Sequence, residues 1–141
     1  MKSKLSFLIT FAFLLISGGL HAQSFKVVVD SGNPITSLTR SEASDLFLKK
    51  KTKWVNGTTV FPVDLISGSK VREDFSQQIH GKGVATIRAF WKQAVSSGKV
   101  SAPPEKANDA EVIDFIKKNP GAIGYVSSTT NSAGLKVVKI N

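Results

Sequence analysis

Two serines flank a glycine at Ser67-Gly68-Ser69, and this short stretch is the part of the sequence best suited to hold an anion. It follows an apolar segment typical of a strand and precedes a segment with helical spacing. The first N–H groups of a helix lack partners within it, and the helix dipole places partial positive charge beside them. Arg72 would add a planar donor and Lys70 a point charge. Helix capping by either serine explains the same residues equally well.

Residues for enzymatic or metal chemistry are scarce. The chain has no cysteine and two histidines, of which His21 falls in an N-terminal segment that we expect to be removed. His80 stands beside Gly81 at the end of a predicted helix, where we expect it to be solvated and to complement the helix dipole. A nucleophile therefore lacks a nearby base, and one histidine does not make a transition-metal site. We predict that the protein is not an enzyme and uses no metal or cofactor.

A run of lysines forms the densest basic cluster, and Trp54 follows it directly. Its members are Lys49, Lys50, Lys51 and Lys53. One interpretation is a contact with an anion or a phospholipid beside an aromatic ring. The other is a solvated helix end followed by a core tryptophan, which the position after a helical segment favours.

The first 22 residues have the order of a secretory signal peptide. Lys2 and Lys4 precede an uncharged stretch at residues 5–16, and Ala22 is a small residue at the predicted cleavage position. This stretch is shorter than the ~20 residues that span a bilayer. We therefore predict cleavage after Ala22, no stable membrane span and a location in the periplasm.

Residues 23–141 are predicted to form a single domain, because 119 residues lie within the usual size of one. This segment keeps 17 basic and 10 acidic side chains, and its net charge of +7 favours anionic partners. Export argues against nucleic acid and for a phosphate-bearing small molecule, an acidic polymer or an anionic membrane surface. Solubility alone would also explain the charge.

The hydrophobic pattern and the turn signals predict four strands and four helices. The strands are expected over residues 25–29, 58–65, 122–126 and 135–140. The helices are expected after Thr39, which has capping-box spacing with Glu42, over 71–79, over 84–95 and after Asn108. Ile87, Phe90 and Trp91 share the apolar face of the third helix and are predicted core residues. The order β-α-β-α-α-α-β-β predicts an α/β fold, a layered sheet flanked by helices in which Pro62 marks an edge strand or a bulge.

Several segments occur together in an order found in one known family. They are SLTRSEASDLFLKKKTKW at residues 37–54, Asn56-Gly57, the strand and helix around Ser67 to Ser69, Phe90-Trp91, and NPGAIGYV at residues 119–126. In these the chain resembles the phosphate-type substrate-binding proteins of ABC transporters. The resemblance implies one lobe of a periplasmic-binding-protein fold, in which Ser67, Gly68 and Ser69 bind an oxyanion. Family members have an arginine just before this motif and a glycine after Phe-Leu. In this chain residues 63–66 contain no arginine, and Lys49 stands in place of the glycine.

Two functions follow from the residues and the resemblance. The first is an exported solute-binding-like protein that recognises phosphate or another oxyanion at Ser67, Gly68, Ser69 and Arg72. Because the chain corresponds to about one lobe, an envelope protein partner would supply the other. The second is an envelope accessory or protein-interaction domain that retains the fold without a ligand.

Overall fold

Five strands form the central sheet of the computed structural model, which describes residues 23–98 and 100–141. Their order across the sheet is β2-β7-β1-β6-β3. Their bounds are β1 Phe25–Asp30, β2 Ser37–Leu38, β3 Phe61–Pro62, β6 Ala122–Ser127 and β7 Leu135–Ile140. The central β1 is antiparallel to β6 and β7, whereas the edge strands β2 and β3 are parallel to their neighbours. The predicted signal peptide, residues 1–22, lies outside the described residues.

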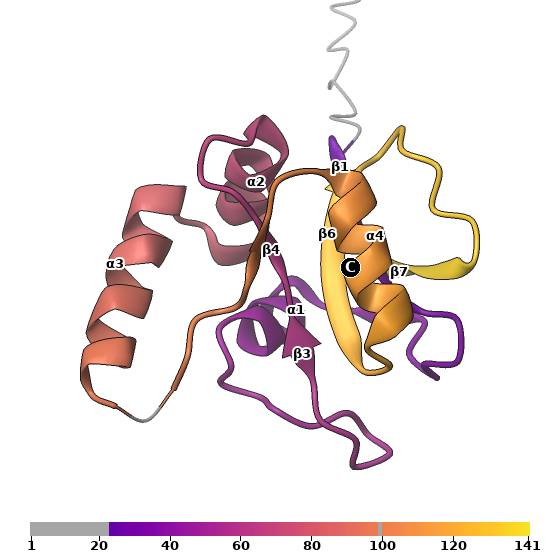
Figure 1. Cartoon of the computed structure of the whole chain (residues 1–141), viewed down its shortest axis with the longest axis horizontal. Helices are drawn as coiled ribbons and strands as arrows, with labels where there is room; N and C mark the ends of the chain where they lie inside the picture. Colours follow the sequence, from indigo (N-terminus) through magenta and orange to yellow (C-terminus); the bar gives the residue numbers. More distant parts are fainter. Residues whose placement is uncertain (1–22, 99) are drawn as a thin grey trace, which may run out of the picture.

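Helices cover both faces of this sheet. α1 (Arg40–Phe47) and α2 (Lys70–Phe75), which continues into η1 (Ser76–His80), bring Phe47 and Phe75 against Tyr125 of β6. α4 (Asp109–Lys118) packs over the adjacent residue, Gly124 (Figure 1). Because successive residues of a strand point to opposite faces, the α1–α2 pair and α4 lie on opposite sides. None of the helices in the described residues is long and apolar enough to cross a membrane.

Aromatic rings dominate the core on the α1–α2 side. The ring of Phe75 stacks on that of Tyr125, with centroids 3.8 Å apart and planes inclined by 6°. Phe25 and Phe47 meet Phe75 edge-on at 5.3 and 4.7 Å. All four side chains are fully buried, as are those of residues 27–29 of β1. The first predicted strand is therefore confirmed, and its consecutive buried residues show that it is covered on both faces.

The strand predicted over residues 58–65 is divided between two sheets. Its first part, β3, lies at the edge of the main sheet, as Pro62 predicted. After Val63 the chain leaves this sheet, and β4 (Asp64–Leu65) pairs in parallel with β5 (Glu105–Lys106). β2 and β5 were not predicted, because two residues are too few to give a periodic pattern.

α3 (Val84–Ser96) stands to one side of the central sheet and packs beside η1 (Figure 1). Val84, Ile87 and Trp91 are buried, which confirms the predicted inner face for Ile87 and Trp91. Phe90 is 37% exposed, so the prediction that it is a core residue was wrong. η1 covers only a narrow stripe of α3, and Phe90 lies beside that stripe with its ring edge-on to Trp91, the centroids 5.1 Å apart.

Both ends of α1 have a clear local cause. The capping box is confirmed, since Thr39 Oγ1 accepts from the Glu42 N–H and Glu42 Oε2 accepts from the Thr39 N–H. After the helix, Lys49 has a φ of 56°, in the left-handed region where glycine is least strained. This conformation gives a reason for the glycine that the family has here. Lys49 Nζ donates to the Ser101 carbonyl at 2.8 Å, which adds a contact to the strained residue.

Candidate functional site

The predicted anion site is an exposed turn between β4 and α2. The Ser69 N–H donates to the Ile66 carbonyl at 3.0 Å and closes the turn, with Ser67 and Gly68 exposed at its tip. Ser69 then caps α2, because its Oγ accepts from the Arg72 N–H at 3.2 Å. The interpretation that a serine caps this helix is therefore confirmed for Ser69. Capping uses Oγ as an acceptor and leaves the hydroxyl proton available to a ligand.

Several backbone donors at this turn are unpaired in the described structure. The N–H groups of Ser67, Gly68, Lys70 and Val71 have no acceptor among residues 23–98 and 100–141. A Cβ added at Gly68 would meet no heavy atom within 4 Å, so a ligand has open access to the backbone there. Free N–H groups in a turn and at the start of the helix that follows it are donors suited to an oxyanion.

Arg72 is held by β4 and β5. Its Nη1 donates to the Leu65 carbonyl at 2.8 Å and pairs with Glu105, and its Nη2 lies 4.0 Å from Asp64 Oδ2. The guanidinium is buried. It thus stabilises the strand end that leads into the turn, and the prediction that Arg72 contacts an anion directly stays a prediction.

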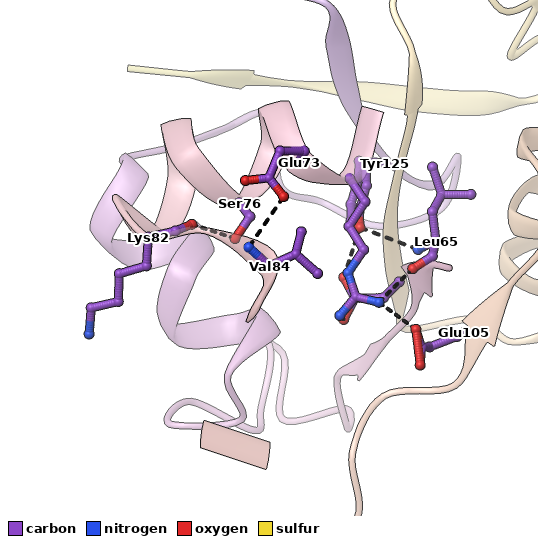
Figure 2. A network of polar contacts seen from close by, with 9 residues as sticks. Leu65, Glu73, Ser76, Lys82, Val84, Glu105 and Tyr125 are labelled. Carbon is purple, nitrogen blue, oxygen red and sulfur yellow. Dashed lines mark hydrogen bonds and ion pairs between the residues drawn. The ribbon is translucent and has the colours of Figure 1, made fainter. Parts of the chain in front are cut away.

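Tyr125 completes this buried network. Its hydroxyl donates to Asp64 Oδ1 at 2.9 Å and accepts from the Leu65 N–H at 3.2 Å (Figure 2). Burial raises the pKa of Asp64, an effect that the Arg72 charge opposes, and burial also raises the pKa of Tyr125. The sequence signal for this network was a single charge, Asp64, inside a buried strand, since a buried carboxylate needs partners. It gave no indication of which partners these would be.

Charges beside the turn largely compensate one another. Lys70, whose side chain is 86% exposed, lies 3.0 Å from Asp74 Oδ2. Ser24 Oγ also donates to Asp74, and these hydrogen bonds lower the pKa of that carboxyl, the Ser24 bond most. The turn therefore depends chiefly on backbone dipoles and hydroxyls to attract an anion, with Lys70 as a mobile contribution.

His80 is not the solvated helix-end residue that the sequence predicted. Its Nδ1 lies 2.8 Å from Ser44 Oγ of α1, and its ring meets Phe75 edge-on at 5.6 Å. Burial, reinforced by the charge of Arg72, lowers the pKa of His80 to about 4. The correction has a simple physical reason: α1 packs on η1 and covers the ring, which the helical pattern of residues 71–79 does not reveal.

Acidification is expected to destabilise the wild-type protein more than the His80→Gln variant. Folded His80 stays neutral down to about pH 4, whereas an unfolded histidine titrates near pH ~6.5. The unfolded state binds more protons between these values, so this contribution, on the order of 2 kcal/mol, is lost as the pH falls through the window. Urea unfolding of both proteins at several pH values measures it, and parallel stability curves would contradict the assignment.

The lysine run matches the interpretation that the sequence favoured. Trp54 is buried, and its Nε1 donates to the Gly121 carbonyl at 2.9 Å. Lys49 and Lys53 bond to Ser101 and Thr59, while Lys50 and Lys51 are exposed. Within the part of the chain that the structure describes, no group of three metal-ligating side chains comes together.

The fold is that of a single lobe of a substrate-binding protein, as predicted. Similar solved structures include a protein assigned as a phosphate ABC transporter substrate-binding protein from Clostridium perfringens, solved with bound phosphate. Its TM-score is 0.65 at 19% identity over 83% of this chain and 44% of that chain. An ABC-type phosphate transport receptor from Vibrio cholerae has a TM-score of 0.65 and 15% sequence identity, over 83% of this chain and 46% of that chain. PstS from Borrelia burgdorferi has a TM-score of 0.64 and 15% identity, over 84% of this chain and 47% of that chain.

This chain therefore spans less than half the length of the solved structures it matches. No protein-family model and no curated protein matches the sequence. The proteins with this fold named above are transport receptors and substrate-binding proteins, and not enzymes.

Proposed function

We propose that the protein is an exported, solute-binding-like protein that recognises phosphate or a similar oxyanion at the turn formed by Ser67, Gly68 and Ser69. One observation carries this proposal: four backbone N–H groups have no partner in the described structure, two in the turn at residues 67 and 68 and two in the first turn of α2. Their setting supports it, since the chain has the fold of proteins named for phosphate transport, one of them solved with bound phosphate.

Recognition would use neutral donors first. The donors would be the N–H groups of residues 67, 68, 70 and 71 and the two serine hydroxyls, at a turn where a Cβ added to Gly68 would meet no heavy atom within 4 Å. Lys70 adds a cation at the rim, and Arg72 braces the turn from behind through Leu65. Because water competes at an exposed site, affinity is expected to lie well below that of a ligand enclosed between two lobes. An envelope protein that supplies the second lobe would raise it.

The predicted signal peptide over residues 1–22 supports the periplasm as the location. There the basic surface of residues 23–141 meets small anions and envelope components, and not nucleic acid.

A second function is favoured by the network around Arg72. This cation is paired with Glu105 and Asp64 and so contributes little charge to an external anion. This supports an accessory domain that keeps the fold and binds an envelope protein through its surface, without a small ligand.

Phosphate is expected to raise the melting temperature of the wild-type protein at millimolar concentration, because a ligand that binds only the folded state stabilises it. Replacing Ser67 and Ser69 by alanine should abolish this shift. The loss of the Ser69 cap, about 1 kcal/mol, affects baseline stability as well, so Thr39→Ala is the matched control. It removes the cap of α1 and should lower stability while leaving the phosphate response intact.

The titration is made at constant ionic strength, and calorimetry with phosphate, sulfate and an organic phosphate accompanies it. Added sodium chloride should weaken binding if Lys70 contributes. An absence of heat and of any melting shift in the wild-type protein would refute anion binding by this chain and leave the accessory function.

A further inference from the structure

A hollow remote from the turn at Ser67 lies between the segment after β1 and the loop that follows the lysine run. Its apolar part encloses about 300 Å³ and is lined by Pro34, Ile35, Trp54 and Val55. A polar part of about 150 Å³ adjoins it, with Asp30 and Thr58 in its wall. Two asparagines, Asn33 and Asn56, line both parts.

Asn33 is a buried polar residue with half of its side chain unused. It is only 8% exposed. Its Oδ1 accepts from the Ile35 N–H at 3.0 Å, and its carbonyl accepts from Lys136. Its Nδ2 has no partner among residues 23–98 and 100–141. Trp91 Nε1 is also unpartnered but is sealed from solvent, whereas Asn33 Nδ2 is not. Asn33 lines both parts of the hollow, so a ligand bound there is the partner that we assign to this donor.

Two more polar groups of the hollow have spare capacity. Asn56 Oδ1 accepts from the N–H and the hydroxyl of Thr58, at 3.1 and 2.7 Å, which leaves its Nδ2 without a partner in the described structure. Asp30 Oδ2 accepts from the Gly32 N–H at 2.9 Å, while its Oδ1 has no such bond there. The polar part thus offers two amide donors and one carboxylate acceptor.

The apolar part is built to receive a side chain. The indole N–H of Trp54 is used by Gly121, so the ring meets a ligand through its carbon surface. Val55 is 87% exposed beside it. A volume of about 300 Å³ lies at the lower end of ligand pockets, which span roughly 300–1,000 Å³, and it favours a short segment over a nucleotide-sized cofactor.

We propose that this hollow binds an extended peptide segment of a partner protein through one aliphatic side chain. The side chain enters between Trp54, Val55 and Ile35. The carbonyl of the same segment accepts from Asn33 or Asn56, and its N–H donates to Asp30. A peptide unit is the group that presents one acceptor and one donor next to an apolar side chain. This site is independent of the proposed anion site.

The test is an NMR titration of the isotope-labelled protein with the blocked peptide acetyl-Gly-Leu-Gly-amide. The chain has two tryptophans, so its two indole signals are assigned with a Trp91→Phe variant. The Trp54 signal should shift in a saturable manner, and the Trp91 signal, on α3, should stay in place. The triglycine analogue, which lacks the leucine side chain, should not shift the Trp54 signal.

Asn33→Asp keeps the acceptor for the Ile35 N–H and removes the Nδ2 donor, so it should weaken peptide binding about tenfold. Asn131→Asp is the matched control, since Asn131 Oδ1 accepts from the Ala133 N–H in the same manner at an exposed loop. Val55→Ser tests the apolar part without touching the core and should also weaken binding. An unmoved Trp54 signal, unchanged binding by Asn33→Asp, or binding of free leucine in place of the blocked peptide would overturn the proposal. Phosphate binding at the turn is measured in separate titrations, so the result for one proposed site does not decide the result for the other.

Discussion

Arg72→Met is expected to lower the free energy of unfolding by about 3–5 kcal/mol, because it leaves a buried carboxylate without its counter-charge. Arg72 supplies the cation opposite Asp64 and Glu105 and a hydrogen bond to the Leu65 carbonyl. Urea unfolding measures the change. Lys70→Met is the control, since that cation is 86% exposed and two residues away, and its loss should cost less than about 0.5 kcal/mol.

A double variant, Arg72→Met with Asp64→Asn, separates charge from packing. Removing the stranded carboxylate should recover part of the stability if the ion pair is the cause. The phosphate response provides a second readout. An Arg72→Met protein that is as stable as wild type and has lost only its response to phosphate would make Arg72 a ligand-binding residue, as the sequence suggested.

Phe75→Ala is expected to cost about 3–5 kcal/mol, the usual range for deleting a buried phenylalanine ring. Its ring stacks on Tyr125 and receives the edges of Phe25 and Phe47, so the cavity would open in the centre of the core. Phe90→Ala is the matched control at a ring that is 37% exposed and should cost much less. Equal losses in chemical denaturation would show that the core is not centred on Phe75.

The sequence predicted the long elements well because each has a clear local pattern. α3 and α4 bury side chains at helical spacing, β1 and β6 are nearly continuous buried runs, and the caps at Thr39 and Asn108 have fixed spacing. The division of residues 58–65 between two sheets was missed. A bend between β3 and β4 depends on distant partners, Ala122 for one strand and Glu105 for the other, and neither is visible in a local pattern.

Only the part of the candidate site that depends on local sequence was predicted. Ser67, Gly68 and Ser69 form a turn before a helix, which local sequence encodes. The environment of Arg72 and His80 comes instead from α1, β4 and β5, whose approach is a tertiary event. Sequence reasoning therefore identified which residues carry chemistry and did not reveal which of them the fold neutralises. The hollow at Asn33 was missed because its walls come from segments far apart in the sequence, at residues 30–35, 54–58 and 120–121.

The position of β1 sets a constraint on when this protein folds. β1 is the first described strand to be synthesised, and its two neighbours, β6 and β7, are the last. Val27 finds its partners Tyr125 and Val138 only after nearly the whole chain has been made. Contacts between such distant segments close late and slow folding. A growing chain with this topology therefore cannot complete its central sheet until residues 135–140 have been synthesised.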